Sequence, residues 1–384
     1  MNINRILTRK SFYLLLIAIA FFTATSSCVS FSSSLPNPSF IEATRISEEL
    51  DFCGEPVPLQ DETVRERLER ELIICMDNSD DIILWLKRSR RYFPYIEELL
   101  KKNNMPDDLK FIAVAESSLR TYAGSPKGAM GYWQFIESTA IKYGLTVNND
   151  IDERRNFFLS TPAALNYLKD LYALFGSWTL AAAAYNMGED GLKAEIIVQK
   201  VNNYYRLFLY QETQRYIFRI LAIKMILSNP EKYGYKLTKD DFYQPVEFDT
   251  IKITAEQTIP ITVIAEAANT YFKTIKDLNP QLRNYYLPPG NFTLHIPKGT
   301  AILFNQRLES LLSKWMNEKS ERIYTVQSGD NLSSIAERFN VSVKALMIWN
   351  SLTSTSRLTA GQKIIVFPGN NNAAINVPDA AKDQ

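Results

Sequence analysis

One glutamate, Glu116, stands where a general acid could work. It follows Leu109 and Ile112 at helical spacing, so its carboxyl group shares a helix face with two apolar side chains. Burial disfavours the charged form of a carboxyl group and raises its pKa, and the negative end of a helix dipole near Ser117 would raise that pKa further. A carboxylic acid that is protonated near neutral pH can donate its proton to a leaving group. Taken alone, the pattern also fits a glutamate in a buried ion pair.

Three further segments rich in amides, hydroxyls and aromatic rings follow this glutamate: Gly131–Gln134, Ala184–Gly188 and Glu212–Tyr216. Their side chains, with the serine after Glu116, could orient a polar substrate, although core packing or helix capping would also explain each one. The candidate substrate-binding residues are Ser117, Gly131, Gln134, Tyr185, Asn186 and Tyr216, and Tyr185 could reach Glu116 itself. Glu137 and Glu189 are the only other carboxylates that invite a catalytic role, and we interpret them as a surface residue and a helix-end residue.

The composition excludes several other catalytic designs. The 384 residues contain one histidine, His295, and three cysteines. Ser-His-Asp or Cys-His hydrolysis would depend on His295 alone, and a zinc site would lack its commonest ligand, so we expect no metal and no cofactor. With 43 basic and 42 acidic residues, the chain also lacks the charge excess of a nucleic-acid binder.

Helices must position the glutamate. Helical periodicity predicts a helical region over 47–104 and a compact all-α domain over 105–230. A hydroxyl cap followed by proline predicts a helix start at Ser160–Pro162, and Gly176 predicts its end. The next predicted helix, Trp178–Tyr185, contains four consecutive alanines. Because small side chains let helices approach closely, we expect this helix at the centre of the domain.

The C-terminal third of the chain contains an internal repeat. A shift of 71 residues places 253–297 on 324–368 without a gap, with 10 identities in 45 positions. Such a repeat indicates two copies of one small unit, and each copy is predicted to run strand, helix, helix, strand. In this register His295 falls on Val366 within an apolar strand, so we expect it to pack rather than react. A connecting helix over 299–322 carries apolar residues on one face, which is typical of core packing.

The second copy, 323–368, contains YTV at 324–326, SGDNL at 328–332 and LTAGQ at 358–362. With these residues it resembles the LysM domain, a βααβ module that binds glycans containing N-acetylglucosamine. The resemblance implies glycan binding by Gly329, Asp330, Asn331 and Asn350. The first copy, 251–298, has Thr258-Ile259 where the family has Gly-Asp. It therefore resembles a degenerate LysM unit, and whether it binds glycan stays open.

The ordered motifs upstream resemble the soluble-lytic-transglycosylase domain, most closely that of the membrane-bound lytic murein transglycosylase D type. The family motifs ES, GxWQ, AYNxG and ETxxY match Glu116-Ser117, Gly131–Gln134, Ala184–Gly188 and Glu212–Tyr216. The resemblance covers roughly residues 85–370 and implies a mainly α fold, in which a lysozyme-like all-α catalytic domain precedes two small βααβ units. Glu137 and Phe218 stand where the family usually has proline, and neither position is catalytic.

The resemblance also implies a reaction and a substrate. The reaction is non-hydrolytic cleavage of the β-1,4 bond between N-acetylmuramic acid and N-acetylglucosamine in the glycan strands of peptidoglycan. Glu116 would protonate the leaving oxygen and then, as a carboxylate, accept the proton of the C6 hydroxyl that closes on C1 to give a 1,6-anhydro sugar. Two alternatives stay open: a hydrolytic muramidase on the same fold, and a LysM wall-binding protein without catalytic activity.

Residues 1–27 are typical of a secretory signal, because basic residues precede a short apolar run and small residues follow it. The segment resembles a bacterial lipoprotein signal, which implies a lipidated Cys28 and a membrane anchor, and simple secretion is the alternative. Val29 lacks the carboxylate that retains many lipoproteins in the inner membrane. The resemblance therefore favours an outer-membrane anchor facing the periplasm.

The ends of the mature chain are expected to be irregular. Residues 28–46 are predicted to be a tether and residues 369–384 a disordered tail. Export would place Cys53 and Cys75 in an oxidising compartment. They are expected either to form a disulfide or to stay as two unpaired residues.

Overall fold

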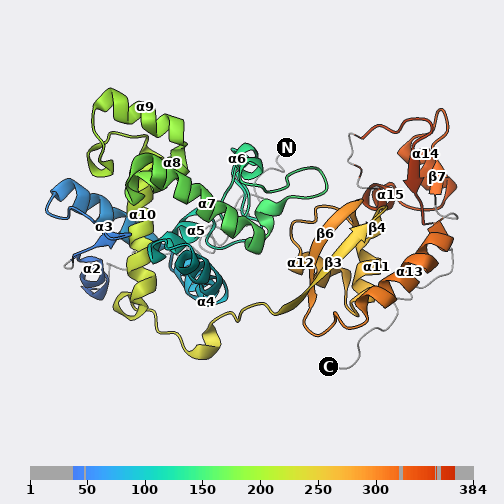
Figure 1. Cartoon of the computed structure of the whole chain (residues 1–384), viewed down its shortest axis with the longest axis horizontal. Helices are drawn as coiled ribbons and strands as arrows, with labels where there is room; N and C mark the ends of the chain where they lie inside the picture. The colour runs from blue at the N-terminus through green and yellow to red at the C-terminus, as the bar shows by residue number, and fades with distance from the viewer. Residues whose placement is uncertain (1–37, 47–48, 320–322, 351, 353–355, 368–384) are drawn as a thin grey trace, which may run out of the picture. The chain divides into compact units, whose positions relative to one another are not determined.

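The computed structural model describes residues 38–46, 49–319, 323–350, 352 and 356–367 (Figure 1). It divides into a short N-terminal unit that ends at Arg45 and a larger unit that begins at Ile46. In the first unit Pro38–Thr44 forms helix α2, within the stretch predicted to be a tether. The signal segment, Cys28 and the C-terminal tail lie outside the described residues. No helix in the described part of the chain is long and apolar enough to cross a membrane.

A β-hairpin opens the larger unit, where the sequence analysis predicted helix. Strands β1 (Asp51–Phe52) and β2 (Glu55–Pro56) pair antiparallel. Cys53 and Gly54 form the two-residue turn, and both have positive φ, as tight hairpin turns require. Helical periodicity could not reveal this turn, because it depends on two backbone conformations rather than on a spacing of apolar residues. Cys53 is not bonded to Cys75, since both are free cysteines.

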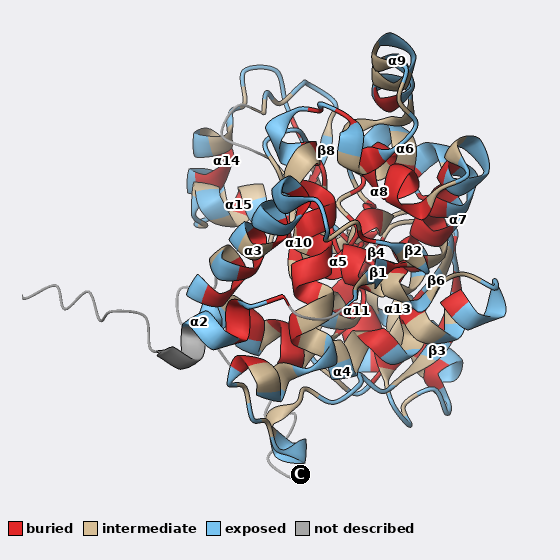
Figure 2. Cartoon of the chain, turned by 90° about the vertical axis from the view of Figure 1, so that its left-hand side faces the viewer, coloured by how far each residue is buried: buried red, intermediate tan, exposed pale blue. Residues whose placement is uncertain are grey.

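The helices that follow confirm the predicted all-α region. Their bounds are α3 (Glu62–Asp77), α4 (Ser79–Lys102), α5 (Lys110–Ser117), α6 (Glu137–Lys142), α7 (Phe157–Phe175), α8 (Trp178–Met187), α9 (Glu189–Gln199) and α10 (Gln211–Ser228). Helix α10 packs against α3, α5 and α8, and α7 packs against α8. Figure 2 shows buried residues concentrated in α5 and α10. The four alanines Ala181–Ala184 of α8 are fully buried, which confirms the central place predicted for this helix.

Helix α7 begins earlier than its predicted start at Ser160. Its cap is Asn156, whose side-chain oxygen accepts hydrogen bonds from the N–H groups of Phe158 and Leu159. Thr161 is therefore inside the helix, where its hydroxyl donates to a backbone carbonyl and accepts the indole N–H of Trp133 at 3.0 Å. The predicted end is confirmed, because Gly176 terminates α7 in the left-handed conformation.

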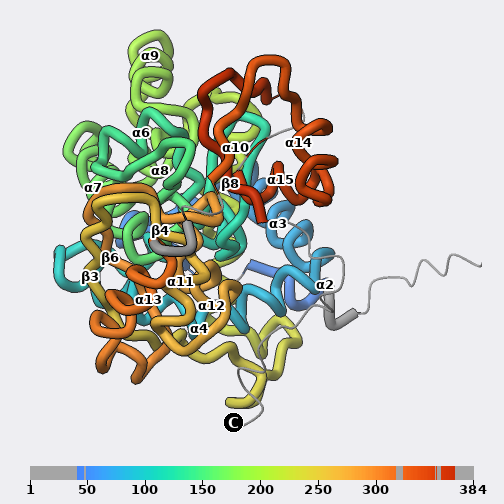
Figure 3. The backbone as a smooth tube through the Cα atoms, turned by 90° about the vertical axis from the view of Figure 1, so that its right-hand side faces the viewer, coloured from blue at the N-terminus to red at the C-terminus, as the bar shows by residue number. Residues whose placement is uncertain are grey.

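Two βααβ units follow the helical domain, as predicted. The first contains β3 (Phe248–Ala255), α11 (Ile261–Ala267), α12 (Phe272–Leu278) and β6 (Gly290–Pro297), with a small extra pair, β4 (Ile259–Pro260) and β5 (Tyr286–Leu287). The second contains β7 (Ile323–Thr325), α14 (Leu332–Arg338), α15 (Val343–Trp349) and β8 (Lys363–Ile365). Helix α13 (Phe304–Lys319) lies beside α11 (Figure 3). Its apolar residues pack on the core of the first unit, which confirms the predicted stripe.

The repeat holds through both helices, and the two units differ in how the closing strand is bonded. Helices α14 and α15 begin 71 positions after α11 and α12. In the first unit the Asn279 amide bonds both backbone groups of His295, and in the second Asn350 does the same with Ile365. This contact places Ile365 where the first unit has His295. The strand pairs displace the register in the opposite sense, because Thr254 faces Asn291 whereas Thr325 faces Lys363. The match of His295 with Val366 therefore stays a prediction.

Candidate active site

Glu116 lies in the last turn of α5, against α10. Its helical neighbours Leu109 and Ile112 are fully buried, and Glu116 is half-buried. Tyr216 of α10 donates a hydrogen bond from its phenol to Oε1 of Glu116. Burial raises the pKa of Glu116 to about 7, although the hydrogen bond from Tyr216 lowers it. A carboxyl group with this pKa can serve as acid and as base near neutral pH.

The helix that carries this glutamate ends where the sequence predicted. Helix α5 stops at Ser117, because Ser118 adopts a left-handed conformation and its N–H bonds to the carbonyl of Val114. The carboxyl group of Glu116 is therefore near the negative end of the helix dipole, which disfavours its charged form.

Two charged side chains of α10 shift the pKa of Glu116 in opposite directions. The negative charge of Glu212 raises the pKa of Glu116, and the positive charge of Arg219 lowers it. These two side chains form an ion pair with each other at 3.0 Å. Sequence reasoning missed Glu212 as a neighbouring carboxylate, although one helical turn separates it from Tyr216 in the same motif.

The two carboxylates considered from the sequence have other surroundings. Glu137 is an exposed residue in the first turn of α6. Glu189 begins α9, where it accepts a hydrogen bond from the hydroxyl of Tyr167 at 2.8 Å and lies 3.4 Å from the ammonium group of Lys142. Both positions agree with the prediction of a surface residue and a helix-end residue.

Ser117 and Gln134 bind the backbone of the motif loop, which we define as residues 123–135. Ser117 is 2 % exposed, and its hydroxyl lies 2.8 Å from the carbonyl oxygen of Tyr132. The side-chain amide of Gln134 donates to the carbonyl oxygens of Ala123 and Gly131, each at 2.9 Å. These contacts fix the shape of the loop, so the structure gives both residues a positioning role.

Tyr185 contributes a third such contact. Its hydroxyl donates to the carbonyl oxygen of Trp133 at 2.7 Å. The possibility that Tyr185 reaches Glu116 is therefore not what the structure shows, because Tyr216 makes that hydrogen bond. The negative charge of Glu116 is still close enough to contribute to the raised pKa of Tyr185, whose main cause is burial.

Asn186 connects two of the motifs. Its side-chain oxygen accepts a hydrogen bond from the hydroxyl of Thr213 at 2.8 Å, which ties the end of α8 to the start of α10. Asn186 is half-buried and follows Tyr185 in the chain, so its amide lies at the edge of the same site.

The residues predicted to bind glycan in the second βααβ unit all have structural roles there. Gly329 forms a turn with a positive φ of 90°. Asp330 accepts hydrogen bonds from the Tyr324 hydroxyl at 2.5 Å and the Gln327 N–H at 2.8 Å. Asn331 caps α14, and Asn350 joins α15 to β8. Glycan binding by these residues stays a prediction.

His295 packs, as expected, between aromatic rings. Its ring stacks on that of Phe248 with centroids 3.9 Å apart and meets the edge of Phe158. Among the described residues, no group of three or more histidine, cysteine, aspartate or glutamate side chains could hold a metal ion.

Three segments of the chain match known sequence families. Residues 93–206, which include Glu116 and the motif loop, match the Transglycosylase SLT domain. Residues 324–367 match the LysM domain, and residues 247–313 match the LysM-like domain of lytic transglycosylase MltD. The two matched segments coincide with the two βααβ units, which we call the LysM-type units below, and the degeneracy of the first stays a prediction.

The chain is also similar to curated proteins. It is 33% identical to the membrane-bound lytic murein transglycosylase D of Escherichia coli (strain K12) over 298 residues, which cover 74% of this chain and 65% of that protein. The chain thus spans about two thirds of that relative's length. It is 49% identical to an autolysin of Enterococcus faecalis over 53 residues, which cover 14% of this chain and 7% of the autolysin.

A solved structure also shows a partial likeness. The 70 kDa soluble lytic transglycosylase from Escherichia coli matches with a TM-score of 0.32 and 16% sequence identity, covering 46% of this chain and 33% of that one. The mainly α fold predicted from the sequence rests on the observed helices and on the SLT match.

Proposed function

We propose that this protein is a lytic transglycosylase that cleaves the β-1,4 bond between N-acetylmuramic acid and N-acetylglucosamine in peptidoglycan. The observation that supports this best is Glu116, whose pKa of about 7 suits proton donation and proton acceptance at the same pH. The SLT domain around it and the likeness to a lytic murein transglycosylase support the substrate class.

In the first step the protonated carboxyl group of Glu116 donates its proton to the glycosidic oxygen, and the bond from that oxygen to C1 of the muramic acid breaks. In the second step the Glu116 carboxylate takes the proton of the C6 hydroxyl of the same sugar, whose oxygen closes on C1. The product is a 1,6-anhydro sugar, and the glutamate returns to its protonated form. The reaction needs no water and only one carboxyl group, unlike glycoside hydrolysis with two carboxylates.

Tyr216 stabilises the carboxylate form of Glu116, which acts in the second step. Its phenol donates to the carboxyl group and lowers the pKa of Glu116, so it stabilises the carboxylate left after the first step. Burial and the negative charge of Glu212 act in the opposite direction. Because these effects oppose one another, the protonated and the charged form of Glu116 are both populated near neutral pH.

The other predicted substrate residues divide into two roles in this proposal. The half-buried Asn186 carries an amide that suits hydrogen bonds to hydroxyl and acetamido groups of the sugars. The amide nitrogen of Gln134 is bonded to the motif loop, so only its side-chain oxygen is left to accept a hydrogen bond from a sugar. Ser117, Gly131 and Tyr185 shape the wall of the site through the motif loop. The second LysM-type unit would hold the enzyme on the glycan strands through Gly329, Asp330, Asn331 and Asn350.

We also propose that the enzyme is anchored through a lipid on Cys28 and faces the periplasm from the outer membrane. The support is the sequence of the signal segment and the likeness to a protein described as membrane-bound. Metabolic labelling with a fatty acid should mark the wild-type protein and not a Cys28→Ala variant. Equal labelling of the two proteins would contradict the anchor.

Digestion of purified peptidoglycan tests the reaction. The mature protein should release muropeptides with anhydro ends, which are lighter than reducing ends by one water, and mass spectrometry separates the two. Reducing ends would instead support a hydrolytic muramidase, and no release would support a wall-binding protein. Glu116→Gln should abolish release, because an amide can neither donate nor accept the catalytic proton.

A further inference from the structure

The segment between α6 and α7 pairs with the first LysM-type unit through its backbone. Ile151 forms an antiparallel bridge with Leu282, in the loop after α12. On either side of this bridge the N–H groups of Asp152 and Arg283 donate across the contact, each at 2.8 Å. The helical domain and the LysM-type unit are therefore joined by a β-bridge with a backbone hydrogen bond on either side.

Buried side chains also contribute to this contact. Ile151 is 5 % exposed and belongs to the apolar core of the first LysM-type unit, although it precedes β3 by almost a hundred residues. The amide of Asn156 donates to the side-chain oxygen of Gln281 at 2.9 Å, and both residues are nearly fully buried. Asn156 is also the cap of α7, so the contact reaches the start of that helix.

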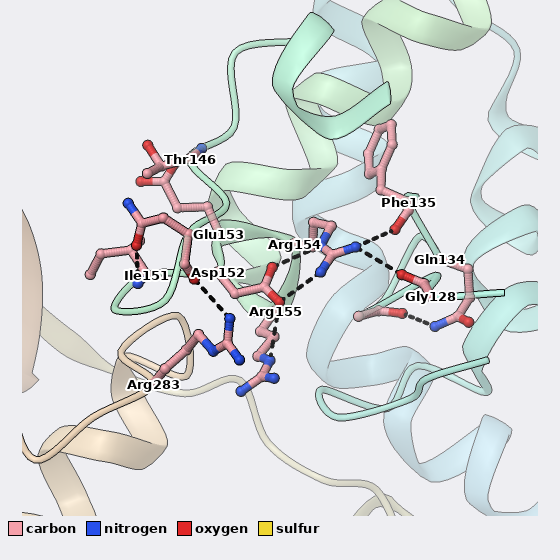
Figure 4. Close-up of polar contacts among 12 residues, drawn as sticks. Gly128, Gln134, Phe135, Thr146, Ile151, Asp152, Glu153, Arg154, Arg155 and Arg283 are labelled. Atoms are coloured by element: carbon pink, nitrogen blue, oxygen red, sulfur yellow. Dashed lines mark hydrogen bonds and ion pairs between the residues drawn. The ribbon is translucent and has the colours of Figure 1, made fainter. Parts of the chain in front are cut away.

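A buried ion pair continues from this contact into the helical domain (Figure 4). Asp152 is 1 % exposed and accepts two hydrogen bonds from Arg154, at 2.8 and 2.9 Å. The same guanidinium donates to the carbonyl oxygens of Gly128 and Phe135 at 2.9 and 3.1 Å. Because a buried arginine needs all these partners, the ion pair holds the middle of the motif loop at Gly128 and its end at Phe135.

The motif loop also touches the backbone of this arginine. A Cβ atom added to Gly131 would lie 1.9 Å from the carbonyl oxygen of Arg154, so only glycine fits there. On its other side the loop is bonded to Ser117, the residue after Glu116, and to Tyr185. The connection from the LysM-type unit to the surroundings of Glu116 is therefore continuous, and Asp152, Arg154 and Ser117 along it are buried.

We propose that the first LysM-type unit is a structural part of the active site, which holds the motif loop in its binding geometry through Asp152 and Arg154. This proposal rests on the proposed function for its kinetic consequence only. Arg154 is a positioning residue, since it acts through the loop. The unit lacks the aspartate that orders the first turn of its sister unit, where Asp330 bonds Tyr324 and Gln327. Its loop after α12 is occupied by the helical domain.

The experiment compares three full-chain variants with the wild type. Ile151→Ala removes most of a buried apolar side chain from the contact and changes no residue of the motif loop. Arg154→Lys keeps the charge and loses the paired hydrogen bonds to Asp152 and the loop carbonyls. The matched control is Leu346→Ala, which removes an equally buried side chain from the core of the second LysM-type unit.

The first measurement is hydrogen exchange of the amides in residues 128–135, which needs no activity. Ile151→Ala and Arg154→Lys should raise this exchange about tenfold or more, and Leu346→Ala should leave it unchanged. Unchanged exchange in Ile151→Ala would overturn the proposal, whatever reaction the enzyme performs. Circular dichroism of each variant identifies global unfolding, in which case the milder Ile151→Val replaces Ile151→Ala.

The second measurement is the kinetics of cleavage of a short soluble glycan, which requires no attachment to the wall. Ile151→Ala and Arg154→Lys should raise KM about tenfold, with a smaller change in kcat, because the loop binds substrate and Glu116 is intact. Leu346→Ala should weaken binding to purified sacculi instead. If Ile151→Ala weakens sacculus binding and leaves KM and loop exchange unchanged, the first unit binds glycan and the proposal is wrong.

Discussion

Replacing Tyr216 with phenylalanine should move the pH dependence of the reaction toward alkaline pH. The phenol makes a direct hydrogen bond to the Glu116 carboxyl group and lowers its pKa, which burial brings to about 7. A hydrogen bond to a charged group contributes about 1.5–3 kcal/mol, and each pKa unit corresponds to about 1.4 kcal/mol. The pKa of Glu116 should therefore rise by about 1–2 units in Tyr216→Phe.

The assay is kcat/KM for a soluble glycan as a function of pH. The first step needs protonated Glu116, so the wild-type rate should fall as pH rises through about 7. In Tyr216→Phe this fall should begin about 1–2 pH units later, while kcat near neutral pH decreases because the carboxylate has lost a donor. Tyr204→Phe is the matched control, because it removes another buried phenol that bonds backbone carbonyls near α10 and does not contact Glu116. An alkaline limb that stays in place in Tyr216→Phe would refute the reasoning about this hydrogen bond.

Three further predictions concern stability. The pKa of Glu116 is raised from 4.5 to about 7, so its contribution to stability is full below pH 4.5 and is lost as pH rises through about 7. Glu116→Gln should therefore gain stability over the wild type as pH rises from 5 to 8, by about 3 kcal/mol in urea unfolding, and a pH-independent difference would contradict this. Gly131→Ala should cost about 2–4 kcal/mol, because its Cβ would meet the carbonyl of Arg154, whereas Gly128→Ala, with a similar φ and open space, should cost about 1 kcal/mol. A reducing agent should leave Tm unchanged, because Cys53 and Cys75 are free, and a lower Tm would reveal a disulfide.

Local patterns were enough to predict the placement of the glutamate. Spacing from Leu109 and Ile112 put Glu116 on a buried face, and the end of α5 lies at Ser117 as expected. The alanine run predicted the buried centre of α8. These features depend on neighbours within a few turns, where helical periodicity carries the information.

Long-range partners were not predictable in the same way. The cap of α7 at Asn156 is bonded to Gln281, and Ile151 packs in a core formed mostly by residues after 250. A polar residue before an apolar run gives no sign of which distant segment will cover it. The bonding of β8 was not predictable for a similar reason, because identities on either side of a loop do not report how the closing strand pairs.

The polar residues of the motifs have different functions that the sequence could not separate. In the structure Tyr216 bonds the carboxyl group, whereas Ser117, Gln134 and Tyr185 bond backbone carbonyls of the motif loop. Replacing a side chain that holds the loop changes substrate binding. Replacing a side chain that bonds the carboxyl group changes the pH at which that group is protonated. Substitution of Tyr185 should therefore raise KM without moving the pH limb, and substitution of Tyr216 should move the limb. Kinetics at several pH values would distinguish the two roles even though both residues are tyrosines of helices that pack against each other.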